Sequence, residues 1–135
     1  MDIKEINRQV IEQFRAGGEI TGMHRDRLLL LTTTGAKSGR RRTTPMKFDR
    51  DGDRVLVMAS NAGATKAPDW YHNLVADPHV TVEIGDETYE TVAVVAEGAE
   101  RARLWSMITD HYPFFIEHAA KAGREIPVVV LERPA

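Results

Sequence analysis

Thr32-Thr33-Thr34-Gly35-Ala36-Lys37-Ser38-Gly39-Arg40-Arg41-Arg42 is a hydroxyl- and glycine-rich segment between two runs of residues typical of β-strands. The run before it, Leu28-Leu29-Leu30-Leu31, predicts a buried strand, and residues 41–48 after it are also typical of a strand. A short polar turn joins two strands as an antiparallel pair, whereas alternating strands and helices would form a parallel sheet. The segment therefore predicts an antiparallel sheet.

Two further turns divide the rest of the chain into strands. Asp51-Gly52 and Gly85-Asp86 are typical of hairpins, because glycine adopts the positive φ that tight turns require. The expected strands are residues 46–48, 55–57, 80–84, 89–95 and 126–131. Helical spacing of apolar residues predicts helices at 2–16 and 97–112. The fold class is therefore α+β, with about six antiparallel strands that could close into a small barrel and helices around it.

The chain length of 135 residues fits a single domain, and no linker or repeat divides it. We expect an N-terminal amphipathic helix within residues 1–20 and a β-domain at 21–135. Lys4, Arg8 and Arg15 leave contact of this helix with a membrane surface open, although Glu5 and Glu12 reduce its basic character.

The composition excludes several classes of protein. With 42% hydrophobic and 28% charged residues the chain resembles an ordinary globular domain, and no apolar run approaches the roughly 20 residues that span a bilayer. The first residues lack a secretory-signal pattern, so we expect a cytoplasmic protein, with membrane association as the alternative. The absence of cysteine excludes disulfides, thiolate metal ligands and a cysteine nucleophile.

Positive charge is concentrated in the opening segment. Residues 35–47 hold five basic side chains and no acid, whereas the rest of the chain holds thirteen basic and twenty acidic residues. Flexible glycine amides, a serine hydroxyl and cations suit an anionic ligand such as a phosphate or a carboxylate. We expect Lys37, Ser38 and Arg42 to bind it. The acidic remainder argues against a nucleic-acid partner.

A second segment of small residues, residues 59–68, follows a predicted strand and precedes Asp69-Trp70-Tyr71-His72-Asn73. Small residues allow a ligand to approach the backbone closely. Asp69 is expected to cap a short helix that starts at Trp70, which would place free amides and two aromatic rings beside the loop. Together the two segments suit a flat heteroaromatic ring with a charged tail, although Trp70 and Tyr71 could instead be core residues.

Other catalytic patterns are missing from the sequence. The five histidines have no metal-ligand spacing, so no metal site is expected. No G-x-S-x-G elbow surrounds Ser38 or Ser60, and the G-x-G-x-x-G and phosphate-loop fingerprints are absent. The sequence has polar residues suited to ligand binding but few that could perform acid–base or covalent chemistry. This indicates that a cofactor carries the reaction.

From about Leu28 to Leu131 the chain resembles the deazaflavin-dependent nitroreductase family, whose members use reduced coenzyme F-420 and adopt a flavin-binding split β-barrel. The motifs that carry the resemblance are Thr33 to Gly39 with Arg42 and Pro45-Met46, Ala59 to Ala64, Pro68 to Leu74, and Ile126-Pro127-Val128. The resemblance implies a six-stranded antiparallel split β-barrel with flanking helices, similar to flavin reductases. It also implies coenzyme F-420 as cofactor, and by analogy a homodimer.

By this resemblance the coenzyme is bound by two groups of residues. Lys37, Ser38 and Arg42 would hold its phosphate and acidic tail, and the residues around Ser60 and Tyr71 would line its ring and linker. The cofactor-binding set is Ala36, Lys37, Ser38, Arg42, Pro45, Met46, Met58, Ala59, Ser60, Asn61, Asp69, Trp70, Tyr71, His72 and Asn73. Ser60 and Tyr112 are the candidate catalytic residues.

The resemblance implies hydride transfer from the reduced deazaflavin to a small electron acceptor that is quinone-like, nitroaromatic or another conjugated electrophile. The characterised nitroreductase of the family has tyrosines where this chain has Lys47, Phe115 and His118, so nitroimidazole activation does not carry over. It also has an arginine at Ala36 and a lysine at Asn61. The alternatives are an oxidoreductase that uses flavin mononucleotide (FMN) on the same barrel and a non-catalytic deazaflavin carrier.

Overall fold

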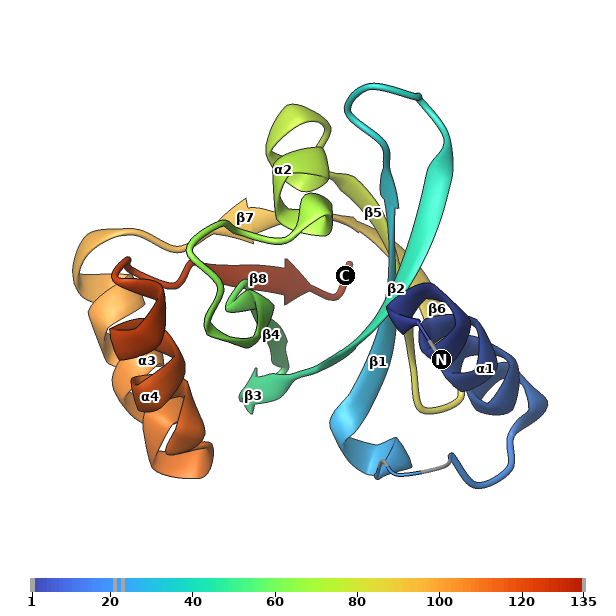
Figure 1. Ribbon diagram of the computed structural model, residues 1–135, viewed down its shortest axis with the longest axis horizontal. Coiled ribbons are helices and arrows are strands. Elements are labelled where there is room, and N and C mark those ends of the chain that lie inside the picture. Colours follow the sequence, from blue (N-terminus) through green and yellow to red (C-terminus); the bar gives the residue numbers. More distant parts are fainter. Residues whose placement is uncertain (1, 21, 23, 135) are drawn as a thin grey trace.

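The computed structural model describes residues 2–20, 22 and 24–134. Its helices are α1 (Ile3–Ala16), α2 (Asp69–Ala76), α3 (Gly98–His111) and α4 (Phe114–Ala122), with short 3-10 turns η1 (Arg25–Arg27) and η2 (Asn61–Gly63). Its strands are β1 (Leu28–Thr34), β2 (Arg41–Lys47), β3 (Asp49–Asp51), β4 (Arg54–Met58), β5 (His79–Ile84), β6 (Glu87–Val92), β7 (Val94–Val95) and β8 (Val128–Glu132). Helices and antiparallel strands therefore form the expected α+β fold (Figure 1).

Within the described residues the strands form two four-stranded antiparallel sheets, with the orders β2-β1-β5-β6 and β3-β4-β8-β7. The expectation of a single six-stranded barrel is therefore corrected. The expected strand at 89–95 is divided at Ala93, which separates β6 from β7. Phe48 separates β2 from β3, a short strand within residues 49–53, which were expected to form only a turn. At each of these two residues the chain passes from one sheet to the other, so the sheets pack face to face.

The predicted hairpins are confirmed. β3 and β4 pair with Asp51 opposite Arg54, and β5 and β6 pair with Ile84 opposite Glu87. Gly52 and Gly85 occupy these turns with φ of 60° and 57°, the left-handed region that glycine enters without a steric cost. The turn chemistry read from the sequence therefore sets the register of both pairs.

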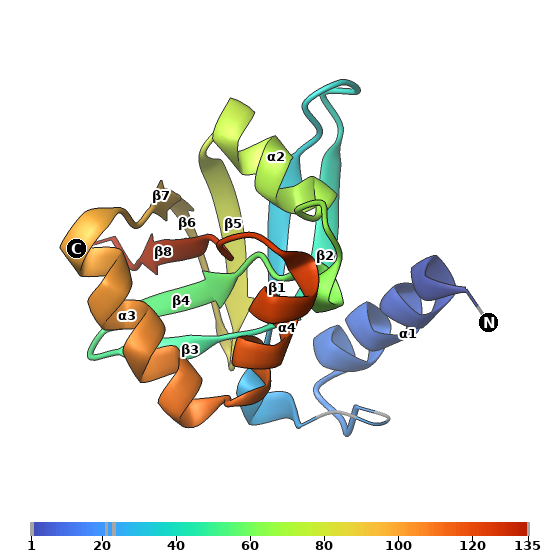
Figure 2. The same ribbon diagram turned by 60° about the vertical axis from the view of Figure 1, so that its left-hand side comes forward.

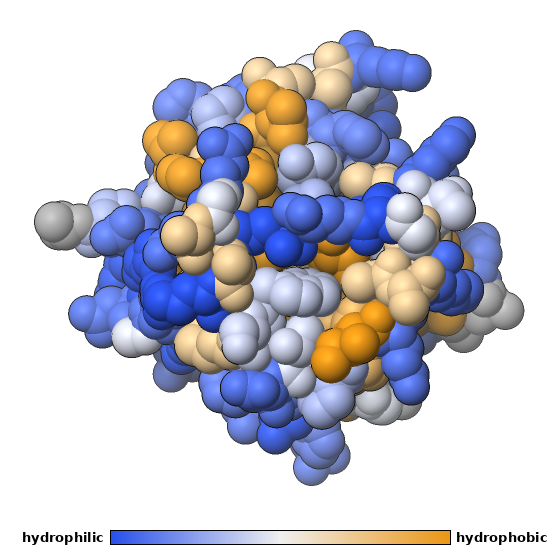
Figure 3. All heavy atoms as spheres, turned by 90° about the vertical axis from the view of Figure 1, so that its left-hand side faces the viewer, coloured by the Kyte–Doolittle hydropathy of each residue, from blue (hydrophilic) through white to orange (hydrophobic). Residues whose placement is uncertain are grey.

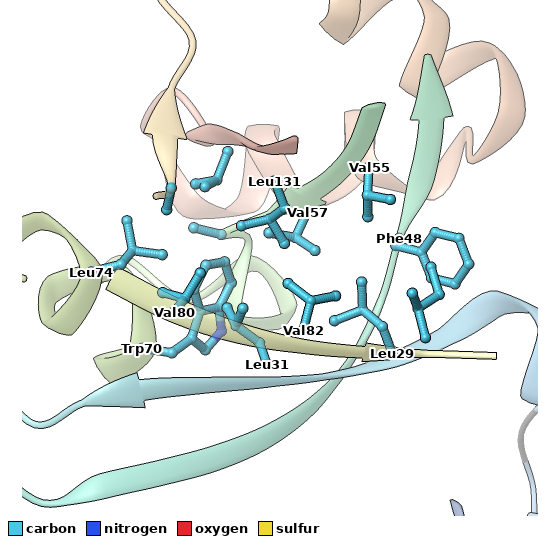
Figure 4. Packing of buried hydrophobic residues seen from close by; sticks show 14 residues of the cluster. Leu29, Leu31, Phe48, Val55, Val57, Trp70, Leu74, Val80, Val82 and Leu131 are labelled. Atoms are coloured by element: carbon cyan, nitrogen blue, oxygen red, sulfur yellow. The ribbon is translucent and has the colours of Figure 1, made fainter. Parts of the chain in front are cut away.

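Among the described residues, three apolar layers hold the elements together. The central layer lies between the two sheets and includes Leu29, Leu31, Val57, Val82 and Leu131 (Figure 4). A second layer packs α3 and α4 on the outer face of the β4–β8 sheet, and a third packs α1 on the outer face of β1. Since successive residues of a strand point to opposite faces, β1 contributes to two layers and reads as a continuous apolar run.

The predicted N-terminal helix is α1. The Asp2 carboxylate accepts a hydrogen bond from the Glu5 amide at 2.9 Å and caps the helix, while Gly17 with φ of 81° ends it. Val10 and Phe14 are buried against β1, whereas Ile3 is 68% exposed. Figure 2 shows the N-terminal end of α1 extending away from the sheets. No helix in the described part of the chain is long and apolar enough to cross a membrane.

Helix α4 was not predicted from the sequence. The expected helix at 97–112 corresponds to α3, and the chain then turns at Pro113 into a second, shorter helix. Only Phe115 and Ala122 of α4 are buried, which is too few for a clear helical pattern. On the side of the molecule shown in Figure 3, hydrophobic areas are separated by hydrophilic side chains.

Candidate active site

The basic segment forms the turn of the β1–β2 hairpin, at the end of the hairpin beside α2 (Figure 1). The Gly35 amide donates to the Arg40 carbonyl at 2.8 Å, and the Gly39 amide donates to the Gly35 carbonyl at 2.9 Å. The Arg40 amide donates to Ser38 Oγ at 3.2 Å. These bonds give the turn a defined shape although its side chains are exposed.

Gly35 brings a hydroxyl and a guanidinium together. A Cβ atom at this position would lie 2.5 Å from Ser38 Oγ and 3.7 Å from Arg42 Nε, so both polar groups approach the space that glycine leaves open. None of the ion pairs found in the described residues involves Lys37 or Arg42. A hydroxyl with cations that are not neutralised by acids fits a phosphate or carboxylate ligand.

A Gly35→Ala change should weaken the binding of an anionic ligand, because the added methyl group displaces Ser38 Oγ. We expect a loss of affinity of about tenfold, equivalent to about 1.4 kcal/mol. Ser38→Ala removes the atom that clashes, so adding Gly35→Ala to that variant should cost much less. Titration of the four proteins of this double-mutant cycle checks the prediction, and an equal cost of Gly35→Ala in both backgrounds would contradict it.

The cations of the turn belong to two faces of β2. Arg42 pairs with Thr33, whose side chain is buried toward α2, so Arg42 lies on that face. Arg41 lies on the opposite face, where it donates to Thr34 Oγ1, to the His79 carbonyl and to Thr81 Oγ1 at 3.0, 3.2 and 2.7 Å. Arg41 is therefore held by protein groups, whereas Arg42 remains available to a ligand.

The same alternation separates Pro45 from Met46. Pro45 pairs with Leu30, which packs toward α1, whereas Met46 packs against the central layer with Leu29. Adjacent residues of a strand point to opposite faces, so the two side chains cannot line one surface of a ligand. Of the two predicted residues, Met46 lies on the same face as Arg42.

Asn73 connects the basic turn to α2. Its side chain is 8% exposed, and its Oδ1 accepts a hydrogen bond from the Ala36 amide at 3.0 Å. Its Nδ2 donates to Thr33 Oγ1 at 3.3 Å. One side chain therefore fixes both the first residues of the turn and the strand that leads into it. The structure places Asn73 behind the turn, as a residue that positions it.

The small-residue segment leads from β4 to α2 and is strained. Asn61 and Ala62 have φ of 50° and 53°, a left-handed conformation that costs a residue with a side chain about 1–3 kcal/mol. The Asn61 side chain donates to the Lys66 carbonyl at 3.1 Å, and Ser60 is only 8% exposed. Consecutive strained residues that are held in place are typical of ligand-binding loops.

Arg124 fixes this segment and was not predicted from the sequence. Its Nε donates to the Ala64 carbonyl at 3.2 Å, and its Nη2 lies 3.2, 3.1 and 3.3 Å from the carbonyl oxygens of Ala59, Ser60 and Lys66. All four acceptors are backbone atoms about 60 positions away. Because backbone carbonyls carry no residue identity, no sequence pattern identifies such a contact.

Helix α4 packs on the same segment. A Cβ atom at Gly63, where φ is 82°, would lie 3.0 Å from Lys121 Cδ and 3.3 Å from the His118 carbonyl oxygen. Only glycine combines this conformation with this close approach. His118 in turn lies edge-on to Phe115 at 5.6 Å between ring centroids, and its Nδ1 is buried without a hydrogen-bond partner in the described residues. Aromatic side chains of α4 therefore lie close to the η2 turn.

The predicted residues of α2 have different environments. Trp70 is 8% exposed and packs in the central layer (Figure 4), whereas Tyr71 is half-buried and His72 is exposed. The rings of Tyr71 and His72 meet edge-on at 5.9 Å. Asp69 is the first helical residue and Pro68 occupies the N-cap position, so the expected capping by Asp69 was wrong. Tyr71 and His72 are the aromatic residues that α2 presents to solvent.

Met58 and Ala59 also lie in different layers. Met58 is buried against α3 and α4, while Ala59 is buried in the central layer beside Trp70. Tyr112 packs against the same layer as Met58, with its ring 6.0 Å from that of Phe115. Its hydroxyl donates to the Phe48 carbonyl at 3.1 Å. Burial, and then the nearby Asp49 carboxylate, raises the pKa of Tyr112 above its ordinary value.

A large hollow of the described surface lies elsewhere. It has a volume of about 910 Å³ and lies between the end of α1, η1, Phe48 and the turn at Gly85. None of the predicted site residues lines it. The candidate site is therefore an open surface formed by the basic turn, the strained segment and α2, and its definition rests on polar groups and loop geometry.

Comparison with known proteins agrees with the resemblance seen in the sequence. Residues 5–133 match the protein family described as F420H(2)-dependent quinone reductase. An F420H(2)-dependent quinone reductase of Mycobacterium tuberculosis is 40% identical over 108 residues, which cover 78% of this chain and 72% of the relative.

Solved structures give the same result. An F420-H2 dependent reductase is 37% identical with a TM-score of 0.72, over 82% of this chain and 100% of that chain. A structure described as a domain-swapped dimer is 35% identical with a TM-score of 0.74, over 93% and 96% of the two chains. A heme storage protein of Vibrio cholerae, at 17% identity and a TM-score of 0.61, over 93% and 88%, shares the fold alone. The prediction of a deazaflavin-dependent family is confirmed, and the chain belongs to the F420H(2)-dependent quinone reductase family.

Proposed function

We propose that this protein transfers a hydride from reduced coenzyme F-420 to a quinone. Family membership supports the reaction, and the site observation that carries the proposal is the open space at Gly35 between Ser38 Oγ and Arg42. Coenzyme F-420 has a lactyl-phosphate and a polyglutamate tail, so it suits cations without acidic partners. When bound, the coenzyme supplies the hydride, and the protein orients the two reactants and holds the polar groups around them.

The residues of the site have distinct proposed roles. Lys37, Ser38 and Arg42 bind the phosphate and the acidic tail, and Asn73 holds the turn that carries them. Ser60 lies at the start of the strained segment and is the residue proposed to hydrogen-bond the polar edge of the ring. Tyr71 and His72 line the linker between ring and tail. Lys37 and Arg42 are the residues that favour this coenzyme over FMN, which carries fewer negative charges.

Tyr112, a half-buried residue at the end of α3, is proposed as the proton donor to the reduced quinone, because a phenol hydroxyl is protonated at neutral pH and can donate its proton. Tyr112→Phe should lower kcat about tenfold, since solvent water replaces the donor only in part. Tyr89→Phe is the matched control, because the Tyr89 hydroxyl also donates to a backbone carbonyl, that of Leu131 at 3.2 Å. Both changes should lower the free energy of unfolding by about 1 kcal/mol. An equal kcat for the two variants would remove Tyr112 from the reaction.

The reaction is tested by mixing the purified protein with reduced coenzyme F-420 and menadione without oxygen. We expect oxidation of the coenzyme to depend on both protein and quinone, with nitroaromatic compounds tested in parallel as a second acceptor class. A protein that binds the coenzyme but oxidises it no faster than buffer does would be a carrier, and the proposed reaction would be wrong.

Assembly and membrane contact are proposed on separate grounds. The domain-swapped dimer among the similar structures supports a homodimer, which sedimentation of the purified protein tests. The exposed Ile3, with Ile6 one turn further along α1, supports contact with a lipid surface, and co-sedimentation with anionic vesicles tests it. An Ile3→Ser variant that sediments with vesicles as well as the wild type would contradict this contact.

A further inference from the structure

Arg124 constrains the direction of two backbone amides in the strained segment. Its guanidinium hydrogen-bonds the carbonyl oxygens of Ala59 and Ser60, so both oxygens point toward it. In a trans peptide the carbonyl and the following N–H point in opposite directions, and no cis peptide occurs in the described part of the chain. The N–H groups of Ser60 and Asn61 must therefore point away from Arg124.

Neither of these amides donates a hydrogen bond within the part of the chain that the structure describes. The neighbouring amides of Ala59 and Gly63 donate to the carbonyls of Pro127 and Ser60, each at 3.0 Å, but those of Ser60 and Asn61 donate to no other described residue. Ser60 has right-handed helical angles and Asn61 has a positive φ, a succession that turns consecutive N–H groups into one concavity. The segment thus presents two oriented donors on the side opposite Arg124.

We propose that Arg124 is a positioning residue that aims the Ser60 and Asn61 amides at a carbonyl oxygen of the coenzyme ring. The inference rests on the proposed function, since it assigns the ring of coenzyme F-420 to these donors. Without Arg124 the carbonyls of residues 59, 60, 64 and 66 lose a shared donor. The left-handed conformation of Asn61 and Ala62 thereby loses one of the contacts that hold it. The amides would then adopt several directions, and binding would have to order them.

Arg101 provides a matched control. It is also half-buried, its Nη2 donates to the Ile126 carbonyl at 2.5 Å, and its Nε lies 2.9 Å from Glu125 Oε1. Both arginines thus donate to backbone carbonyls, Arg101 just before β8 and Arg124 in the segment from Ala59 to Lys66. Replacing either removes a guanidinium–carbonyl contact, so a general loss of stability should be common to the two variants.

The test compares Arg124→Gln, Arg124→Lys and Arg101→Gln with the wild type. The dissociation constant of oxidised coenzyme F-420 is measured by tryptophan fluorescence, and the amide chemical shifts of Ser60 and Asn61 are measured without coenzyme. We expect Arg124→Gln to raise the dissociation constant about tenfold and to move both shifts, because it loosens the donors before binding. Arg101→Gln should lower the melting temperature but leave affinity within about twofold and both shifts unchanged.

Several results would overturn the proposal. The first case is a wild-type protein that binds the coenzyme and an Arg124→Gln variant whose dissociation constant is within twofold of the wild-type value. The second is an Arg124→Gln variant with unchanged amide shifts of Ser60 and Asn61. Either result would show that Arg124 does not position the amides. An equal loss of affinity in Arg101→Gln would make the effect one of stability. If Arg124→Gln does not fold, the Arg124→Lys variant tests the proposal instead. Its single ammonium group replaces only part of the hydrogen bonding of the guanidinium, so the dissociation constant should rise several-fold. Wild-type protein that does not bind the coenzyme would instead contradict the proposed function itself, and this inference with it.

Discussion

Replacing Arg42 with glutamine should weaken the binding of coenzyme F-420 about ten- to a hundredfold. The guanidinium lies beside Gly35 and Ser38 Oγ and has no acidic partner among the ion pairs of the described residues. A hydrogen bond between charged groups contributes about 1.5–3 kcal/mol, and every 1.4 kcal/mol changes the dissociation constant tenfold. Fluorescence titration of the variant measures the loss directly.

Arg41→Gln is the control for this prediction. Arg41 is adjacent in sequence and carries the same charge, but its guanidinium is bound to Thr34, Thr81 and the His79 carbonyl on the other face of the hairpin. Its replacement should leave the dissociation constant within about threefold, which reflects the lost long-range charge alone. Equal effects of the two substitutions would show that binding depends on net charge and not on a site at Gly35.

Replacing Asn73 with alanine should lower both the stability and the affinity of the protein. The change leaves the Ala36 amide and the buried Thr33 hydroxyl without their partner, which should reduce the free energy of unfolding by about 1–3 kcal/mol. The basic turn then loses its attachment to α2, and ordering it on binding should raise the dissociation constant about tenfold. Denaturant unfolding and coenzyme titration of the same preparation measure the two effects.

Thr32→Val separates these two effects. Thr32 Oγ1 and Thr43 Oγ1 lie 2.8 Å apart on the opposite face of the same hairpin, and the substitution removes that hydrogen bond. It should reduce stability by about 1 kcal/mol and leave affinity unchanged. If Asn73→Ala destabilised the protein without changing the dissociation constant, the attachment of the turn to α2 would have no part in binding.

Sequence alone was sufficient for features set by neighbouring residues. The hairpin turns at Gly52 and Gly85 follow from local turn chemistry, and the basic turn follows from the two strands that flank it. The opposite directions of Arg41 and Arg42 could also have been predicted, since side chains alternate along a strand. Treating the cations of this turn as one cluster overlooked that alternation.

The remaining features depend on contacts between distant parts of the chain. Asn73 bonds to residues 37 and 40 positions away, and Arg124 bonds to backbone carbonyls about 60 positions away. Neither contact leaves a periodic pattern in the sequence. The division of the 89–95 strand at Ala93 was also missed, because a bend between two packed sheets leaves the apolar pattern on both sides unchanged. Strand β3 was missed because its residues, Asp49 to Asp51, are all polar.

The measurement that tests this account most directly is a titration of the wild-type protein with coenzyme F-420 and, in parallel, with FMN, followed by tryptophan fluorescence. Trp70 lies on α2, which follows the strained segment and holds the basic turn through Asn73, so it should report binding. A Trp105→Phe variant isolates its signal. The account predicts saturable quenching by coenzyme F-420 at micromolar concentration and much weaker binding of FMN. Tighter binding of FMN, or no response to either compound, would contradict it.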